Sequence, residues 1–224
     1  MTTCILIPGA GGDAWYWHRL VPLLEQRGHE AIAVDLPAAD DSAGLPEYAE
    51  TVVEAAGDRG DLVVVVAQSM GGLTAPLVCS RLPVSRLVLV NAMIPAPGET
   101  GGDWWTNTGQ DQARRECDRR EGRSPDGPFD PLVYFFHDVP QDITDQAMAG
   151  GSPQSGTPFA QPWPLDAWPD VPTEVLSGGA DRFFPAEFQT RVAQQRLGVT
   201  PERLPGGHLL ALSRPEALAA ALDR

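Results

Sequence analysis

Segment 62–72, with the sequence LVVVVAQSMGG, constrains the fold more than any other stretch of the chain. Its run of β-branched residues favours a strand that is buried on both faces of a parallel sheet. The run ends in small residues around Ser69, and residues 73–82 have the composition of a helix. A strand that turns sharply into a helix with a serine at the apex is typical of a nucleophile elbow. The alternative is a glycine-rich turn in which the serine has no chemical role.

The small residues on either side of Ser69 have a steric reason. In an elbow the backbone of the serine is strained, and strand and helix pass so close that bulk two positions away would clash. These two positions hold Ala67 and Gly71. Glycine is usual at the first of them, so Ala67 is a small departure from the pattern.

Size and charge limit the class of protein. The 224 residues are enough for one domain with a substantial core and an inserted lid. The chain has 16 Lys and Arg against 30 Asp and Glu, a net charge of −14, which argues against a nucleic-acid partner. Its apolar runs fall short of the roughly 20 residues that cross a membrane, so we expect no membrane partner.

Compartment and cofactors are predicted from weaker signals. The residues that follow Met1 lack the basic region that opens a signal peptide, so we expect a cytoplasmic protein. Cys4, Cys79 and Cys117 have no metal-ligand spacing and are expected to be free thiols. We expect no metal and no cofactor, and a monomer or a homodimer.

Strand and helix patterns alternate along both ends of the chain. Strands are predicted at 4–7, 31–34, 62–68, 87–90, 173–176 and 200–204. Helices are predicted at 15–27, 46–56, 73–82, 185–197 and 215–222. This alternation predicts an α/β fold with a doubly wound, mostly parallel sheet of about six strands. Ligands of such sheets bind beyond the carboxyl ends of the strands, where the strand order reverses.

The alternation stops in the middle of the chain. Between positions 95 and 172 lie twelve of the 22 prolines and four of the six tryptophans, which breaks regular strand-helix units. We interpret 95–168 as a lid inserted into a single domain that spans 1–224. It is expected to contain helices around 109–121 and 143–149 and a loop over 150–158.

A serine nucleophile needs a base within hydrogen-bonding reach. On this kind of sheet the acid and then the histidine follow the serine along the chain. His18 and His29 precede Ser69, and His137 lies in the insertion. His208 comes directly after the last predicted strand, where a loop can hold an imidazole above the sheet edge.

The acid is expected between Ser69 and His208, in a loop that follows a strand. Asp181 fits, because it lies in a glycine-rich turn just before a predicted helix. Asp166 and Asp170 are rivals in less suitable surroundings. The alternative for Asp181 is that it only caps the helix.

A tetrahedral oxyanion needs two N–H donors. Met70 supplies one at the start of the helix after the serine. Ala10 supplies the second from the glycine-rich loop that begins at Pro8 and Gly9. This loop lacks the G-x-G-x-x-G and P-loop spacings, which argues against nucleotide binding.

Together the motifs resemble the α/β-hydrolase superfamily, and within it the branch of plant methyl esterases and hydroxynitrile lyases with their bacterial carboxylesterase relatives. The resemblance rests on segments 7–15, 23–24, 28–29, 34–37, 68–72, 178–181 and 206–208. It implies Ser69 as nucleophile, Asp181 as acid, His208 as base, and Ala10 and Met70 as oxyanion donors. Pro8 is a departure, because the family usually has a histidine there, which supports the loop.

The same resemblance points to ester hydrolysis through an acyl-enzyme, with a small-molecule ester as substrate. Its lyase members carry threonine at the position of Gly9 and lysine at the position of Leu209. A ligand receptor, a C–C bond hydrolase and a non-hydrolytic, lyase-like member remain as alternatives. Aromatic residues of the insertion either line an apolar substrate pocket or form the core of the lid: Trp104, Trp105, Phe135, Phe136, Phe159 and Trp163.

Overall fold

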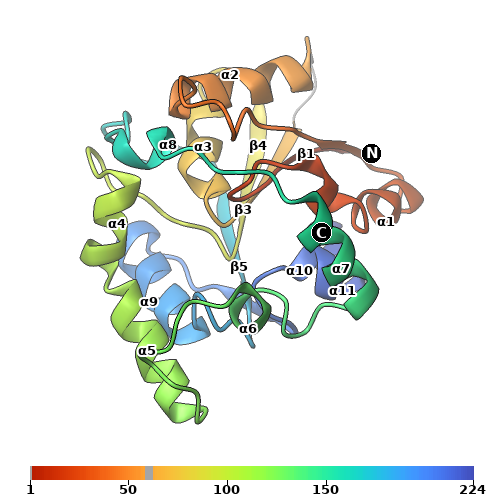
Figure 1. Ribbon diagram of the computed structural model, residues 1–224. Coiled ribbons are helices and arrows are strands. Elements are labelled where there is room, and N and C mark those ends of the chain that lie inside the picture. The colour runs from red at the N-terminus through yellow and green to blue at the C-terminus, as the bar shows by residue number, and fades with distance from the viewer. Residues whose placement is uncertain (1, 59–62) are drawn as a thin grey trace.

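The computed structural model describes residues 2–58 and 63–224 (Figure 1). Leu62, the first residue of the strand expected from the sequence, lies outside the described residues, as does Met1.

Six strands form one sheet in the order β2-β1-β3-β4-β5-β6, and each neighbouring pair runs parallel. This arrangement confirms the predicted α/β fold with a doubly wound parallel sheet. The strands are β1 Thr3–Ile7, β2 Glu30–Ala33, β3 Val63–Gln68, β4 Val84–Val90, β5 Thr173–Gly178 and β6 Glu202–Leu204.

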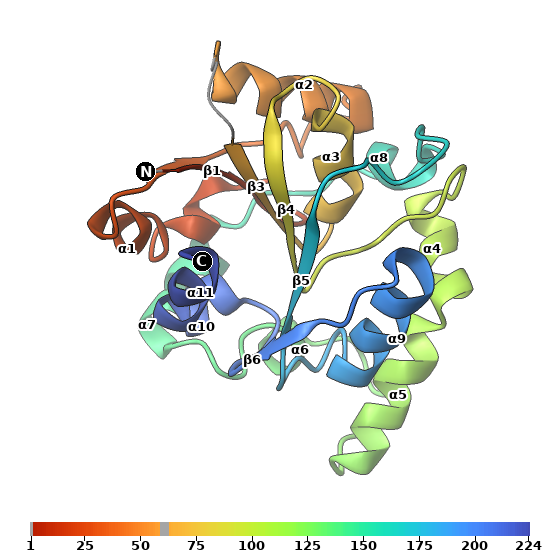
Figure 2. The same ribbon diagram turned by 180° about the vertical axis from the view of Figure 1, so that it is seen from behind.

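Helices cover both faces of the sheet (Figures 1 and 2). One hydrophobic core lies between the sheet and α2 Leu45–Ala56, α3 Gly71–Val78 and α9 Ala186–Leu197. The other lies between the sheet and the 3-10 helix η1 Ala14–Trp17, α1 Val21–Gln26, α10 Leu210–Ser213 and α11 Pro215–Leu222. Within the described ranges, each helix lacks the length or the apolar character that a membrane crossing requires.

Strand β3 lies in the middle of the sheet, and its alternate side chains enter opposite cores. Val63 and Val65 belong to the first core, while Val64 and Val66 belong to the second. Each of the four is at most 4% exposed. Full burial of a valine side chain contributes roughly 1.5–3 kcal/mol, so the β-branched run is what a strand covered on both faces requires.

The strand order reverses between β1 and β3. The chain runs from β1 outward to β2, and then crosses back to β3 on the other side of β1. The loops that follow β1 and β3 therefore diverge to opposite faces, which opens a crevice at the carboxyl edge of the sheet. Residues 8–12 and the turn at Ser69 meet at this edge, since a Cβ atom at Gly9 would lie 3.0 Å from Ser69 Cβ.

Two predicted helices have different bounds in the structure. The helix expected at 15–27 is split into η1 and α1, because Pro22, in the first turn of α1, lacks an N–H group and its ring clashes with a preceding turn of helix. The helix expected at 73–82 begins at Gly71 and ends at Val78. The short helix α10 was not expected, because four residues carry too little periodicity to be read from a sequence.

The chain between β4 and β5 forms five short helices: α4 Gly101–Thr108, α5 Gln110–Arg120, α6 Pro131–Tyr134, α7 Gln141–Gly150 and α8 Thr157–Ala160. Helices α5 and α7 correspond to the two that the sequence predicts. We refer to residues 95–168 as the inserted segment. In Figure 1 its helix α6 lies near the end of β5, and its helix α7 lies beside α10 and α11.

A buried ion pair ties the start of the inserted segment to α9. Arg196 donates to both carboxylate oxygens of Glu99, at 2.5 and 2.7 Å, and Asn107 donates a third hydrogen bond at 2.9 Å. The Glu99 side chain is only 4% exposed. Burial by itself opposes ionisation of Glu99, but the hydrogen bonds from Arg196 and Asn107 outweigh it and hold the pKa of Glu99 below its ordinary value.

Glu99→Gln is expected to lower the free energy of unfolding by about 2–3 kcal/mol at pH 7, because it leaves the Arg196 charge buried without its partner. Since the pKa of Glu99 is lowered in the folded state, the ion pair stabilises the fold fully above the ordinary carboxyl pKa. That stabilisation is lost as the pH falls through the folded-state pKa, so the difference between wild type and variant should narrow in acid. Urea unfolding between pH 7 and pH 3 measures this.

Glu50→Gln is the matched control, because Glu50 pairs with Arg81 at 2.6 Å on the surface, with side chains 52% and 38% exposed. It should cost less than about 1 kcal/mol. Equal losses in the two variants at pH 7 would contradict the role given to the buried pair.

Candidate active site

Ser69 occupies a strained turn between β3 and α3. Its φ angle is +50°, a left-handed conformation that non-glycine residues rarely adopt. Three hydrogen bonds hold this turn: Ser69 N–H donates to Val90 O, and Ser69 O accepts from Gly72 N and Met93 N at 3.1 and 2.8 Å. The surrounding backbone therefore fixes Ser69 at the end of the strand, as in a nucleophile elbow.

Glycine is required beside this turn because the neighbouring backbone is too close for a side chain. A Cβ atom at Gly71 would lie 2.6 Å from Pro8 O, and one at Gly72 would lie 2.0 Å from Met93 O. Ala67, the departure from the usual pattern, is fully buried and packs in the first core. The methyl group at this position is therefore accommodated.

Ser69, His208 and Asp181 are joined by hydrogen bonds although they lie on three separate loops. His208 Nε2 is 3.1 Å from Ser69 Oγ, and His208 Nδ1 is 2.8 Å from Asp181 Oδ2. His208 and Asp181 are 2% and 3% exposed, while Ser69 is partly exposed. The structure thus brings together the three residues that the sequence singled out, in the order that a proton relay needs.

Asp181 is held in place by its own turn and by α9. Its Oδ1 accepts from the backbone N–H groups of Phe183 and Phe184, at 2.8 and 2.9 Å, and its Oδ2 accepts from Gln189 Nε2 at 3.3 Å. The carboxylate therefore caps the turn that precedes α9, and it also binds His208.

The other acids and histidines considered from the sequence lie elsewhere. Asp166 and Asp170 are exposed. His18 stacks on Trp15 and hydrogen-bonds to its carbonyl group, and His29 pairs with Asp223 at 2.7 Å.

Three phenylalanine rings surround the imidazole of His208. Phe135 stacks on it with ring centroids 5.1 Å apart, and Phe183 and Phe184 meet it edge to face at 5.3 and 5.1 Å. These rings limit rotation of the imidazole and keep water from two sides of it. The low polarity around the ring strengthens its hydrogen bond to the Asp181 carboxylate.

Asn91 is a site residue that the sequence analysis missed. It follows β4, is fully buried and has a φ angle of +45°. Its Nδ2 donates to the carbonyl oxygens of Gly207 and His208 at 3.0 and 2.9 Å, and its Oδ1 accepts from Gly178 N at 2.7 Å. A polar residue directly after a strand was the available signal, because loops at the carboxyl edge carry the site.

Asn91 also connects to the acid through Gln189. Gln189 Nε2 lies 3.1 Å from Asn91 Oδ1 and 3.3 Å from Asp181 Oδ2. The loops that carry the acid and the histidine are therefore cross-linked by two buried amide side chains.

The backbone N–H groups of Ala10 and Met70 donate to no acceptor within residues 2–58 and 63–224. Met70 precedes α3, where helix N–H groups have no partner within the helix. The loop that holds Ala10 reaches the serine, because a Cβ atom at Gly9 would lie 3.0 Å from Ser69 Cβ. Free N–H groups next to a candidate nucleophile suit an oxyanion.

Cysteine side chains are poor candidates for a second nucleophile. Burial raises the pKa of Cys4 and of Cys79 to about 11 each, so both thiols stay protonated at neutral pH. Burial, followed by the hydrogen bond and charge of Glu121, also raises the pKa of Cys117. All three are free cysteines.

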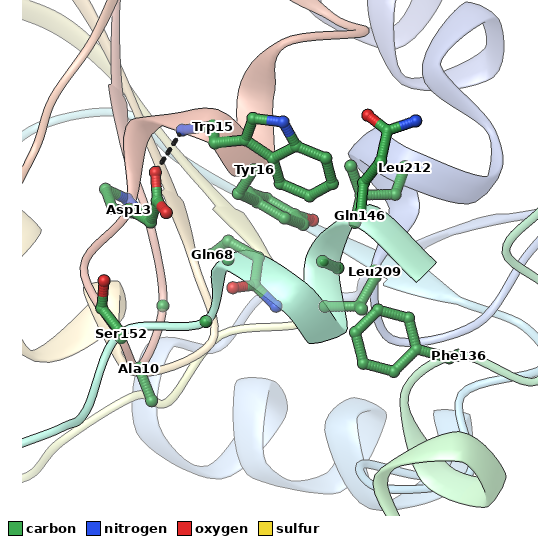
Figure 3. A pocket seen from close by; sticks show the side chains of 16 residues that line it. Ala10, Asp13, Trp15, Tyr16, Gln68, Phe136, Gln146, Ser152, Leu209 and Leu212 are labelled. Carbon is green, nitrogen blue, oxygen red and sulfur yellow. Dashed lines mark hydrogen bonds between the residues drawn. The ribbon is translucent and has the colours of Figure 1, made fainter. Parts of the chain in front are cut away.

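A cavity of about 280 Å³ lies beside this array (Figure 3). Gly9, Ala10 and Gln68 line it near the serine turn, and Trp15 and Tyr16 line another wall. Leu209 and Leu212 follow His208, and the inserted segment contributes Phe136, Gln146, Ala147, Gly150, Gly151 and Ser152. No lysine or arginine is among the lining residues.

The aromatic residues proposed from the sequence divide between this cavity and the core. Phe136 lines the cavity, and Phe135 covers His208 instead. Trp104 is 1% exposed and donates its indole N–H to Ile94 O in the first core. Trp105 packs on Trp104, Phe183 and Phe184, so neither tryptophan lines the cavity.

Residues 4–221 match the family model described as the alpha/beta hydrolase family. This chain belongs to the alpha/beta hydrolase family. The resemblance inferred from the sequence motifs is thereby confirmed.

Two plant esterases are similar to this hydrolase-family chain in part. The probable esterase PIR7A of Oryza sativa subsp. indica is 35% identical over 109 residues, which cover 44% of this chain and 41% of the rice protein. Polyneuridine aldehyde esterase of Rauvolfia serpentina is 34% identical over 107 residues, which cover 43% and 40%. The match thus spans about two fifths of the length of each relative.

A solved structure extends the likeness to the whole fold. The crystal structure of polyneuridine aldehyde esterase superposes on 99% of this hydrolase-family chain and 98% of its own, with a TM-score of 0.79 and 23% identity. In the described part of the chain, no group of three or more His, Cys, Asp or Glu side chains is arranged to hold a metal ion.

Proposed function

We propose that this protein is a serine esterase, which hydrolyses small carboxylic esters through an acyl-enzyme on Ser69. The observation that carries the proposal is the hydrogen-bonded chain from Ser69 Oγ through His208 to Asp181. These three side chains lie beside the backbone N–H groups of Ala10 and Met70, which donate to no acceptor among the described residues. In this reading residues 95–168 form a lid within a single domain that spans 1–224.

In the first half of the proposed reaction, Ser69 Oγ attacks the ester carbonyl carbon while His208 Nε2 takes its proton. The oxyanion that forms accepts hydrogen bonds from the N–H groups of Ala10 and Met70. Asp181 accepts from Nδ1–H and stabilises the imidazolium. The imidazolium then gives its proton to the leaving alcohol oxygen, and the acyl group stays on Ser69.

In the second half, His208 takes a proton from a water molecule, and the water oxygen attacks the acyl carbon. The second tetrahedral intermediate uses the same two donors. When it collapses, the carboxylic acid leaves and His208 returns its proton to Ser69 Oγ. The strained backbone of Ser69 and the rings around His208 keep the reacting groups in place, so little reorganisation is needed.

The cavity supports a neutral substrate of modest size. Its volume of about 280 Å³ is at the small end of the range for pockets that bind small molecules. Its walls offer aromatic and aliphatic side chains, a few amides and one carboxylate, Asp13, whose Oδ1 accepts a hydrogen bond from Trp15 N; none of its lining residues is cationic. A free carboxylate on the substrate would find no partner there, so we propose neutral esters.

Two observations disfavour the lyase alternative. Gly9 has no hydroxyl group, and Leu209, directly after His208, lines the cavity with an aliphatic side chain. At these two positions a leaving cyanide would therefore meet neither the hydroxyl group nor the ammonium group that the lyase members carry there. A receptor with vestigial turnover would bind an ester tightly and release only about one product per protein molecule.

Ser69→Ala should lower kcat for p-nitrophenyl acetate by at least about 10³-fold, because the nucleophile is lost while the fold remains. Ser80→Ala is the control, since Ser80 is an exposed serine in the turn that follows α3. The rate of p-nitrophenolate release, measured with the wild type and both variants, tests the proposal. Wild-type activity in Ser69→Ala would refute the assignment of the nucleophile, and a single burst without turnover would favour the receptor.

Ala147→Phe tests the cavity as the substrate site. The added ring should fill part of the space, so kcat/KM for p-nitrophenyl hexanoate should fall at least about tenfold more than kcat/KM for the acetate, or about 1.4 kcal/mol. Ala149→Phe places the same ring on the exposed side of α7, outside the cavity lining, and should change neither value by more than about twofold. An equal effect of Ala147→Phe on both esters would place the acyl group elsewhere.

A further inference from the structure

The loop that carries His208 is held from two sides. On the sheet side, Asn91 binds the carbonyl groups of Gly207 and His208. On the opposite side, the inserted segment supplies Asp138, whose Oδ2 accepts a hydrogen bond from Gly207 N at 2.8 Å. Gly207 immediately precedes His208, so Asp138 binds the backbone one residue from the imidazole.

Gly207 leaves no space between this loop and the inserted segment. A Cβ atom at Gly207 would lie 2.7 Å from Asp138 Oδ1 and 2.7 Å from His137 Cε1. The same four residues of the inserted segment, 135–138, also place Phe135 on the His208 ring and Phe136 in the cavity wall. A single stretch therefore contacts the imidazole, its backbone and the cavity.

The Asp138 carboxylate has little else to bind. Its side chain is 12% exposed, and Arg214 Nη2 is 4.0 Å away on a side chain that is 44% exposed. Asp138 Oδ1 and both ring nitrogens of the adjacent His137 are buried and find no hydrogen-bond partner among the described residues. Burial, and after it the charge of Arg182, lowers the pKa of His137, so His137 is neutral and supplies no counter-charge.

Burial of a carboxylate is costly unless hydrogen bonds or a counter-charge compensate for its lost hydration. Within the part of the chain that the structure describes, the one short contact of the Asp138 carboxylate is with the N–H group of Gly207, at the start of the His208 loop. A backbone N–H group at that point would otherwise be unpaired beneath the inserted segment. The geometry therefore indicates a role for Asp138 at the site, although Asp138 lies about seventy residues from His208 in the sequence.

We propose that Asp138 is a positioning residue for His208: by accepting from Gly207 N–H it locks the imidazole in line with Ser69, so that the site is complete only when the inserted segment is packed on the loop. The proposal rests on the proposed esterase function. Asp138 acts through Gly207 and does not touch the reacting atoms.

Four variants separate position from charge. Asp138→Ala removes the acceptor, and kcat for p-nitrophenyl acetate should fall about 10–100-fold while KM changes less than about threefold. Asp138→Asn keeps an acceptor oxygen without the charge and should recover kcat to within about fivefold of the wild type. Asp138→Glu keeps the charge but displaces the oxygen, so it should lose kcat like the alanine variant. Asp142→Ala, an exposed acid on α7, is the control and should leave kcat unchanged.

The rates are normalised to the number of reactive serines, titrated with a fluorophosphonate, so that a loss of folded protein does not count as a loss of kcat. Proton NMR gives a readout that needs no turnover. The downfield Nδ1–H resonance of His208, hydrogen-bonded to Asp181, should be sharp in the wild type and in Asp138→Asn, and broadened by exchange in Asp138→Ala. If Asp138→Ala does not fold, Asp138→Glu provides the same comparison.

Wild-type kcat and an unchanged resonance in the alanine and glutamate variants would overturn the proposal. A loss in Asp138→Asn as large as in Asp138→Ala would also overturn it, because the acceptor alone would then not suffice. Failure of the esterase function looks different: the wild type itself would show no Ser69-dependent turnover, while the NMR comparison would still report on Asp138.

Discussion

The parallel pairing of the strands is the constraint on which the site depends. Because every neighbouring pair runs in one direction, the loops after β1, β3, β4, β5 and β6 all begin at the same edge of the sheet. Residues that are far apart in sequence, such as Ser69 and His208, therefore meet there and form a hydrogen bond. The β-branched side chains of β3 pack in both cores and hold the turn at Ser69 against the neighbouring loops. This packing offsets the energetic cost of the strained backbone at Ser69.

The sheet alone does not orient the imidazole. The buried amide side chains of Asn91 and Gln189 bind the loops that carry Asp181 and His208. Three phenylalanine rings enclose the imidazole of His208. The inserted segment then adds the cavity wall and the Asp138 contact. In this account the inserted segment is part of the catalytic geometry as well as a cover over the substrate, because it binds the backbone next to His208.

The sequence predicted those features of the fold and the site that depend on short stretches of the chain. The β-branched run, the small residues around Ser69 and the loops at Asp181 and His208 follow from strand burial and turn sterics, so the fold and the proposed triad were predictable. The split at Pro22 and the short helix α10 were missed because short elements carry little periodicity. The role of Asp138 depends on a contact across the chain, which no local pattern encodes. For Asn91 the available signal was its place directly after a strand, but its partners also lie far along the chain. Trp104 was proposed as a pocket residue because a tryptophan in the inserted segment suits a buried core and a cavity wall equally well, and the sequence alone does not distinguish the two.

A crystal structure of the protein after reaction with diethyl p-nitrophenyl phosphate tests the central claim most directly. The account predicts a covalent bond between phosphorus and Ser69 Oγ, with the phosphoryl oxygen within hydrogen-bonding distance of the N–H groups of Ala10 and Met70. His208 Nε2 should remain close to the modified Ser69 Oγ and Nδ1 should stay bound to Asp181. An adduct on another residue, or a phosphoryl oxygen turned away from both N–H groups, would contradict the account.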